Sequence, residues 1–395
     1  MPSAARSKPI LLNHSRAVSE GFRNWFARLE VKAPLRADPW LWGSAAALIL
    51  LGLMMVLNTT YFLGLEKTGN PFYFFQRQLI NLAVGLVVMT SMAQFSLRGL
   101  HQIAFALMAI AALMLLVVWV PGLGIARGGA RRWLRAGPVL VEPSEIVKLA
   151  TVFFLARYLS AHQEKIHLPK ILVPVFALMG GLAAVLLKQP DFGAAVMLTL
   201  VLFAMLFAAG AQPKHLGAAG SVALLALVIQ AGRKAYRMRR LSAFLNPWQT
   251  AQGSGFQLVQ SFIAFGAGGG WGVGLGASRQ KMFYLPQAHN DFVFAVIGEE
   301  FGVAGALVVI ALFITILVRG MRIARNEADP FGSLLAVGLT ALLSLQAFVN
   351  MAVVTGLVPT KGLPLPFLSY GGTSMVVSLA AVGVLMALGR RSGMR

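Results

Sequence analysis

The chain contains no cysteine and few charged residues. Without cysteine, disulfides, thiolate catalysis and cysteine-ligated metal sites are excluded. Charged residues make up only 12% of the sequence, roughly half of their share in soluble domains. The chain also lacks a P-loop and an HExxH motif, and its glycine-rich stretch at 266–276 does not follow a predicted strand. ATP-driven transport and dinucleotide binding are therefore unsupported.

The chain is rich in hydrophobic residues and contains long apolar runs. Hydrophobic residues make up 57% of the chain, and several apolar runs reach the ~20 residues that cross a bilayer as a helix. A lipid-exposed backbone must satisfy its hydrogen bonds internally. We therefore predict an all-α polytopic membrane protein with ten transmembrane helices. The predicted spans are 40–64, 74–95, 100–121, 143–161, 168–188, 191–211, 215–232, 291–319, 331–356 and 368–389.

An even number of spans places both termini on one side of the membrane, and the positive-inside bias makes that side the cytoplasm. Residues 1–38 are polar and basic and are predicted to form a poorly ordered cytoplasmic tail without a cleavable signal. Residues 39–391 form the membrane domain. Its one long connection, 233–290, is predicted to be extracytoplasmic, with a short interfacial helix near 255–265.

The formal net charge of +21 raises the question of nucleic acid. The basic residues are scattered between apolar runs and no nucleic-acid module is visible, so charge that orients loops at a membrane explains them better. Basic residues kept outside against the usual bias suggest an anionic ligand, although long loops also translocate regardless of charge. Two outer loops hold Arg127, Arg131, Arg132, Arg135, Arg233, Lys234, Arg237, Arg239, Arg240, Arg279 and Lys281.

Acidic residues are scarce, with 13 against 34 basic ones, so a carboxylate at the membrane boundary needs a reason. Asp291 lies where the glycine-rich loop meets an apolar helix. The structural interpretation is helix capping. The functional interpretations are a general base that deprotonates an acceptor hydroxyl, or a ligand of a divalent cation. His289, predicted on the outer side, supports either function or is simply solvated.

Other ionisable residues lie in or beside the predicted spans, where such groups usually have partners or line a polar cavity. Glu145 and Lys148 are three residues apart and share a helix face. Two interpretations apply to the ionisable residues of this group: structural ion pairing, or a polar cavity around Asp291. Its members are Glu145, Lys148, Asp191, Glu299 and Glu300.

Two further segments are candidates for substrate contact. Arg131 and Arg132 precede a tryptophan; paired guanidinium groups fork onto phosphate oxygens, and the alternative is lipid-headgroup anchoring. The segment 359–374 is dense in proline and glycine. Irregular backbone at membrane depth is tolerated only where it faces protein or water. It is expected to form a cleft wall or a simple tight re-entry.

Taken together, five segments resemble the SEDS family (shape, elongation, division, sporulation), and the resemblance covers roughly residues 40–390. The segments are 129–133, 142–145 with Lys148, 189–193, 286–300 and 359–374, and 246–248 is a further landmark. The forms at 288–292 and 359–362 are closer to division-type than to elongation-type members. Two positions depart from the family: Gln287 stands where glutamate is usual, and Asn290 where threonine is usual.

The resemblance implies a ten-helix peptidoglycan glycosyltransferase that polymerises lipid II, an undecaprenyl-pyrophosphate-linked disaccharide-peptide. Asp291 matches the proposed catalytic aspartate, and a divalent cation, Mg²⁺ or Mn²⁺, is a possible cofactor. We assign substrate or pyrophosphate binding to Arg131, Arg132, Lys148, Lys361 and Ser369. We assign a supporting polar cavity to Glu145, Asp191, His289, Glu299 and Glu300.

The resemblance also implies partners and a location. A class B penicillin-binding transpeptidase (FtsI-like), the divisome proteins FtsQ, FtsL, FtsB and FtsN, and membrane lipids are the expected partners, with no nucleic acid. The expected location is the bacterial inner membrane at the division septum. The alternatives are an elongation polymerase of the RodA type, a lipid II flippase or transporter, and a scaffold that only recruits division partners.

Overall fold

The computed structural model describes residues 38–391 apart from 128–129, 138 and 233–234. The predicted tail lies outside the described residues except for Asp38, and so do Arg233 and Lys234. Asp38 caps the first helix by accepting from the backbone nitrogens of Trp40 and Leu41 at 3.0 and 3.1 Å. Its other carboxylate oxygen accepts from Arg319 Nε at 2.6 Å, which ties this end of the bundle together.

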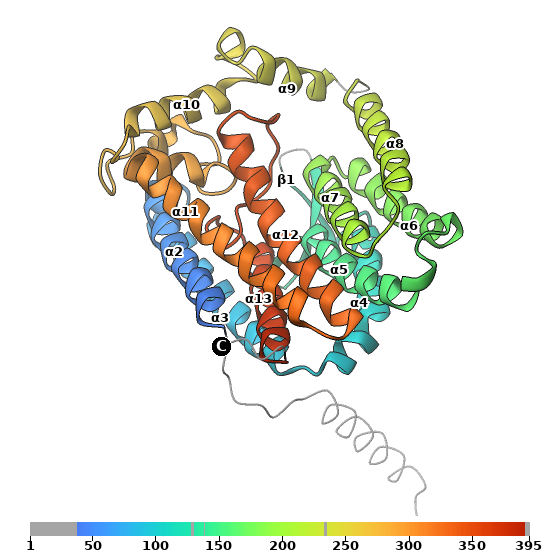
Figure 1. Cartoon of the computed structure of the whole chain (residues 1–395). Coiled ribbons are helices and arrows are strands. Elements are labelled where there is room, and N and C mark those ends of the chain that lie inside the picture. Colours follow the sequence, from blue (N-terminus) through green and yellow to red (C-terminus); the bar gives the residue numbers. More distant parts are fainter. Residues whose placement is uncertain (1–37, 128–129, 138, 233–234, 392–395) are drawn as a thin grey trace, which may run out of the picture.

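A helix occupies each of the ten ranges that the sequence predicts as spans (Figure 1). The helices are α2 (Pro39–Thr68), α3 (Tyr73–Gln94), α4 (Leu97–Val117), α5 (Pro143–Ala161), α6 (Pro169–Lys188), α7 (Phe192–Ala208), α8 (Pro213–Gly232), α11 (Val293–Asn326), α12 (Pro330–Val354) and α13 (Gly372–Arg391). Within the described residues, six of them (α2, α4, α6, α11, α12 and α13) are long and apolar enough to cross a membrane by length and composition.

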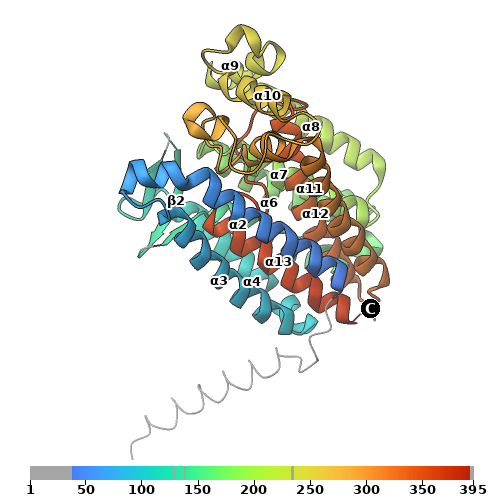
Figure 2. The ribbon, with the colours of Figure 1, turned by 90° about the vertical axis from the view of Figure 1, so that its left-hand side faces the viewer.

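The bundle is built around α12 and α13. In the most apolar stretch of these two helices, 72% and 78% of the residues are buried, against 28% in α4, α6 and α11. Helix α13 packs along α3, and α12 packs against α11, α5 and α7 (Figures 1 and 2). The outer helices turn apolar side chains such as Leu113, Val173 and Leu307 outward, as expected of surfaces that face lipid rather than water.

The 122–142 loop departs from an all-α fold. It forms a small antiparallel sheet in the order β1 (Gly124–Arg127), β2 (Ala130–Ala136) and β3 (Val139–Val141). Successive side chains of a strand point to opposite faces. Arg131 is accordingly exposed, whereas Arg132 is partly buried against the helical body.

The long 233–290 connection contains two helices, α9 (Ala235–Leu245) and α10 (Phe256–Gly268). Helix α10 agrees with the interfacial helix predicted near 255–265. Helix α9 was not predicted; it carries Arg237, Arg239 and Arg240. Both helices lie at the same end of the bundle, across the tops of the long helices (Figure 1).

The glycine-rich stretch after α10 fits against a break in α11. Gly302 has φ 66° and ψ −163°, which interrupts the helix. The loop backbone satisfies the groups freed there: the Val273 nitrogen donates to the Glu299 carbonyl at 3.0 Å, and the Val303 nitrogen donates to the Gly269 carbonyl at 2.9 Å. A Cβ on Gly272 would lie 2.1 Å from the Glu300 carbonyl oxygen. Gly268, Gly272 and Gly302 therefore permit this close backbone contact.

Candidate active site

Asp291 lies in the turn that precedes α11, outside the helix itself. Three hydrogen bonds fasten this turn to distant parts of the chain. Asn350 Nδ2 of α12 donates to the Asp291 carbonyl at 2.8 Å. The Ser369 hydroxyl donates to the Asn290 carbonyl at 2.6 Å, and the Tyr370 nitrogen donates to the His289 carbonyl at 2.8 Å. The backbone at Asp291 is thus held by α12 and by the proline-rich 359–374 segment.

Ser369 acts on this turn through its hydroxyl, which also accepts from the Leu365 nitrogen at 2.7 Å. It is buried, so the structure places it as a support of the turn.

The two positions that depart from the family pattern are hydrogen-bonded to each other: Asn290 Nδ2 donates to Gln287 Oε1 at 2.6 Å. Gln287 has a left-handed φ of 59°, a conformation that this side-chain bond and the Asn290 backbone contact stabilise.

The Asp291 carboxylate lies against the backbone of Gly362. A Cβ placed on Gly362 would come within 2.8 Å of Asp291 Oδ2, and one on Gly193, at the start of α7, within 3.1 Å of the Gly362 carbonyl oxygen. Among the residues that the structure describes, none donates a hydrogen bond to this carboxylate. The carboxylate therefore remains able to accept a proton from an incoming group.

Gly362→Ala is expected to move the Asp291 carboxylate while leaving the fold in place, because the clash is with the end of a side chain rather than with backbone. A displacement of about 1 Å at a reacting group can cost about a hundredfold in rate. We expect a loss of tenfold or more in turnover, measured alongside the thermal unfolding midpoint. Gly371→Ala is the matched control, since its Cβ would meet only an ordinary contact at 3.7 Å; equal activity of the two variants would contradict the arrangement.

Burial raises the pKa of Asp291 to about 6. The charges of Arg240 and Arg132 lower this pKa, and that of Asp191 raises it. Residues from α9, β2 and the start of α7 therefore act electrostatically on one carboxyl group. A carboxyl tuned toward neutral pH in a cleft is the usual form of a general base.

Two neighbouring groups have pKa values lowered by burial. The pKa of His289 falls to about 4, so the ring is neutral near pH 7; it packs against the rings of Phe74 and Tyr370. The pKa of Lys361 falls to about 8, and its ammonium lies 4.7 Å from the centre of the Phe192 ring. His289 thus supports the wall of the site, and Lys361 places a cation next to Gly362.

Arg132 and Asp191 stabilise one turn beside the site. The Arg132 guanidinium donates through Nε to the Gln189 carbonyl at 3.2 Å and through Nη2 to the Pro190 carbonyl. Asp191 caps α7 by accepting from the Ala194 nitrogen at 3.0 Å. Both charges remain close enough to influence Asp291, but each has a structural task. Arg131 points to the exposed face of the sheet.

Lys148 and Glu145 form a buried ion pair at 2.6 Å. Lys148 is only 1% exposed and also donates to Gln346 Oε1 at 2.7 Å. Gln346 in turn donates to the Pro364 carbonyl at 3.0 Å. In this structure Lys148 thus contacts the proline-rich 359–374 segment through Gln346. This agrees with the ion-pairing interpretation of Lys148 and Glu145.

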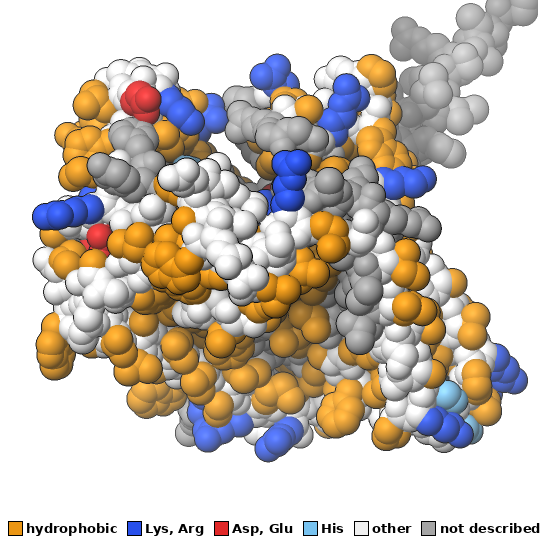
Figure 3. Space-filling view, turned by 90° about the horizontal axis from the view of Figure 1, so that it is seen from above, with side chains coloured by type: hydrophobic (Ala, Val, Ile, Leu, Met, Phe, Trp, Pro, Cys, Tyr) orange, Lys and Arg blue, Asp and Glu red, His pale blue; other side chains and the backbone are white. Residues whose placement is uncertain are grey.

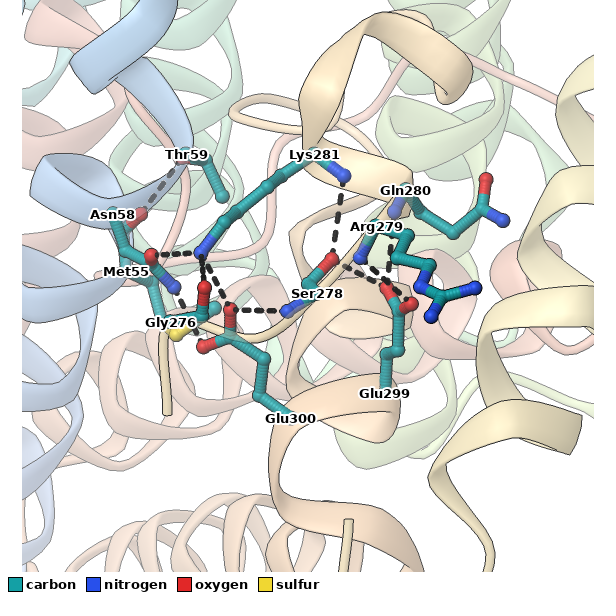
Figure 4. A network of polar contacts seen from close by, with 10 residues as sticks. All are labelled: Met55, Asn58, Thr59, Gly276, Ser278, Arg279, Gln280, Lys281, Glu299 and Glu300. Atoms are coloured by element: carbon teal, nitrogen blue, oxygen red, sulfur yellow. Dashed lines mark hydrogen bonds and ion pairs between the residues drawn. The ribbon is translucent and has the colours of Figure 1, made fainter. Parts of the chain in front are cut away.

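Glu299 and Glu300 belong to a second polar network at the break in α11 (Figure 4). Glu300 pairs with Lys281 at 3.0 Å and accepts from Asn58 Nδ2 of α2 at 2.6 Å. Glu299 accepts from the Ser278 hydroxyl and from the Arg279 nitrogen, the latter at 3.0 Å. The two carboxylates hold the 276–281 turn, so the structure separates them from the group around Asp291.

Glu142 is a further carboxylate close to these residues, and it is absent from the predicted site. It precedes α5 and accepts from the Ser144 hydroxyl at 3.2 Å. Burial, together with the charges of Glu145 and Asp191, raises its pKa to about 8 against the opposing charges of Lys148 and Arg132. Its place in the 142–145 segment was the available signal; its burial beside two other carboxylates was not visible in the sequence.

No three His, Asp or Glu residues within the described part of the chain are grouped so that they could hold a metal ion. Mg²⁺ commonly binds through one or two carboxylates together with substrate phosphates. The Asp291 carboxylate fits that role, because the described residues leave it without a hydrogen-bond donor.

Residues 39–393 match the cell cycle protein family of FtsW, RodA and SpoVE. The chain is 42% identical to a probable peptidoglycan glycosyltransferase FtsW of Geobacter sulfurreducens, over 92% of this chain and 98% of that protein. It is 42% identical to one of Legionella pneumophila, over 89% and 90%. It is 39% identical to the stage V sporulation protein E of Bacillus subtilis, over 87% and 94%.

Solved structures share the fold. One chain of a peptidoglycan synthase complex, whose structure concerns the coordination of polymerization and crosslinking, superposes with a TM-score of 0.75 at 29% identity, covering 91% of this chain and 99% of that one. The rod shape determining protein RodA of Thermus thermophilus superposes with a TM-score of 0.66 at 25% identity, with the same coverage.

Proposed function

The chain belongs to the cell cycle protein family of FtsW, RodA and SpoVE, and we propose that it is a peptidoglycan glycosyltransferase that polymerises lipid II during septal cell-wall synthesis. The name of its FtsW relatives, 42% identical over most of both chains, supports the enzyme class. The observation that carries the mechanism is the Asp291 carboxylate, which lies against the backbone of Gly362, has a pKa of about 6 and is acted on by the charges of Arg240 and Arg132.

In the proposed reaction, Asp291 accepts the proton of the sugar hydroxyl on an acceptor lipid II. That oxygen forms a bond to the anomeric carbon of the donor MurNAc. The bond from this carbon to the pyrophosphate breaks, and undecaprenyl pyrophosphate leaves with the electron pair. The proton then passes from Asp291 to solvent, which restores the base. The charge of Arg132 acts on Asp291, and Lys361 adds a cation next to Gly362.

A divalent cation, Mg²⁺ or Mn²⁺, would stabilise the pyrophosphate charge when bound. Asp291 is the carboxylate that would hold it, with substrate phosphates as further ligands. In that case Asp291 would orient the cation as well as accept the proton. Titration of Mn²⁺ binding with wild type and Asp291→Asn, in the presence of undecaprenyl pyrophosphate, separates the two roles.

The proposed topology uses the ten helices that occupy the predicted spans, six of which are long and apolar enough to cross a membrane. We propose that all ten cross the inner membrane, that both termini are cytoplasmic, and that the Asp291 site faces the periplasm. All segments around Asp291 then come from predicted outer loops. A class B penicillin-binding transpeptidase is the proposed partner, together with the divisome proteins; the fold shared with a chain of a peptidoglycan synthase complex supports this partner.

The test is polymerisation of labelled lipid II by the purified full-length chain, with and without its transpeptidase. A β-lactam blocks cross-linking, so that glycan length reports glycosyl transfer alone. We expect glycan strands that depend on Asp291. Transbilayer movement of lipid II without any glycan would instead indicate a flippase, and side-wall rather than septal localisation in cells would indicate the elongation role.

The rate of polymerisation is expected to fall below about pH 6. Asp291 acts as a base only when ionised, and its pKa is raised from 3.8 to about 6. At pH 5 roughly a tenth of the enzyme would carry the active carboxylate, whereas an ordinary aspartate would be almost fully ionised. The measurement is a pH–rate profile under saturating lipid II. An inflection near pH 4 would contradict a buried base.

A further inference from the structure

An open groove of about 660 Å³ lies beside the Asp291 turn. Its walls come from α9, from the segment before α10, and from the two segments that flank Asp291. None of the described residues that line it is acidic, while two are arginines. The residues that matter here are Arg239, Arg240, Thr250, Gln257, Pro286 and Thr360. Lysine and arginine side chains are spread over the face of the molecule at this end, with few acidic ones (Figure 3).

Two of the segments that line the groove lead to Asp291. Arg240 Nη1 donates to the Thr360 carbonyl at 3.2 Å, which fixes the guanidinium on the 359–362 segment. Two residues further, Gly362 lies against Asp291 Oδ2. Pro286 begins the turn that leads to Asp291. Of the two arginine charges that act on Asp291, that of Arg240 has the larger effect.

Two of the cations predicted to bind pyrophosphate, Lys148 and Arg132, have other partners in the structure. Lys148 is buried between Glu145 and Gln346, and the Arg132 guanidinium binds two backbone carbonyls. Negative charge develops on the pyrophosphate as its bond to the attacked carbon breaks, and a cation placed there stabilises it. Arg239 and Arg240 both line the open groove, and the charge of Arg240 also acts on Asp291.

An exposed apolar edge lies close to these arginines in the sequence. Leu245 ends α9 and Trp248 follows it, and they are 66% and 63% exposed. Tryptophan is favoured where hydrocarbon meets headgroups, and an apolar edge beside two arginines matches a ligand with a charged head and a hydrocarbon tail. Gln257 adds an amide, with two donor hydrogens, to the lining of the same groove.

We propose that Arg239 and Arg240 form the subsite for the pyrophosphate of the lipid-linked donor, the group that leaves when the new glycosidic bond forms. This inference rests on the proposed function. It assigns the leaving group to α9 rather than to the Arg131–Lys148 side of the site. The paired guanidinium groups fork onto the phosphate oxygens and stabilise the charge that develops as the bond to carbon breaks.

The probe is undecaprenyl pyrophosphate, the product that the subsite would hold. Its inhibition constant against lipid II polymerisation is measured for the full-length chain with its transpeptidase, and its affinity is measured directly. Arg239→Gln and Arg240→Gln are each expected to weaken binding about tenfold, because each loses a charge-assisted contact. Arg240→Lys keeps the charge and should recover part of the affinity. Undecaprenol, which lacks phosphate, should bind all variants equally.

Arg279→Gln is the matched control, since Arg279 is an exposed arginine of the same outer connection whose side chain lies outside the groove. Inhibition constants for Arg239→Gln and Arg240→Gln within twofold of this control would overturn the subsite. The subsite would also be overturned if the two substitutions weakened the binding of undecaprenol as much as that of undecaprenyl pyrophosphate. It would likewise be overturned if they weakened binding only in vesicles that contain phosphatidylglycerol. A subsite failure leaves wild type active and dependent on Asp291; a polymerising Asp291→Asn variant instead contradicts the proposed function.

Discussion

Asp291→Asn is expected to lower lipid II polymerisation by at least about a hundredfold, because a positioned general base contributes about 10²–10⁴ in rate. Asparagine keeps the size and the backbone bond from Asn350 to residue 291, but it accepts no proton at neutral pH. The measurement is single-turnover glycan formation with the transpeptidase present and its cross-linking blocked. The loss should appear in kcat, with lipid II binding close to wild type.

The fold should tolerate this change. Burial raises the pKa of Asp291 above its unfolded value, so the ionised carboxylate destabilises the folded state at pH values above about 6. Removing the charge should leave the thermal midpoint unchanged or raise it. Normal glycan synthesis by a well-folded Asp291→Asn protein would refute the base. A folded variant that is inactive but recovers activity with added Mn²⁺ would point to the cation-binding role.

Lys281→Met is expected to destabilise the fold by about 3–5 kcal/mol, because removing one partner of a buried ion pair leaves the other charge uncompensated. Lys281 Nζ contacts Glu300 at 3.0 Å and the Asn58 and Gly276 oxygens at 2.6 Å each. The lost contacts join α2, the glycine-rich loop and the break in α11 (Figure 4). The effect is measured as the shift in thermal midpoint of the purified protein in detergent.

Lys67→Met provides the comparison, since Lys67 is an exposed lysine at the end of α2 and the change removes the same charge. A second substitution, Glu300→Met in the Lys281→Met background, should recover part of the stability, because it removes the unpaired carboxylate. If Lys281→Met and Lys67→Met unfold at the same temperature, the network at the break contributes nothing to the fold.

The helices were largely predictable because each depends on its own stretch of sequence. Apolar runs of sufficient length predicted a helix at each of the ten ranges, and the 255–265 pattern predicted α10. The small sheet and α9 were missed. These elements are short, β2 and α9 are rich in arginine, and their positions depend on contacts with the rest of the chain, such as those of Arg132 with 189–190 and of Arg240 with Thr360. The family resemblance read from five segments is confirmed by the match over 39–393.

Two things about this protein followed from sequence alone: it is a polytopic membrane protein, and Asp291 is the residue to examine. Run length and residue scarcity are local or compositional properties, so they need no coordinates. Only the tertiary structure decided which charged groups surround Asp291. Lys148 meets Gln346 across 198 residues, and Arg240 meets Thr360 across 120. Such pairings depend on how the helices pack, and packing places Lys148 in a buried ion pair and Arg240 in the groove beside the Asp291 turn.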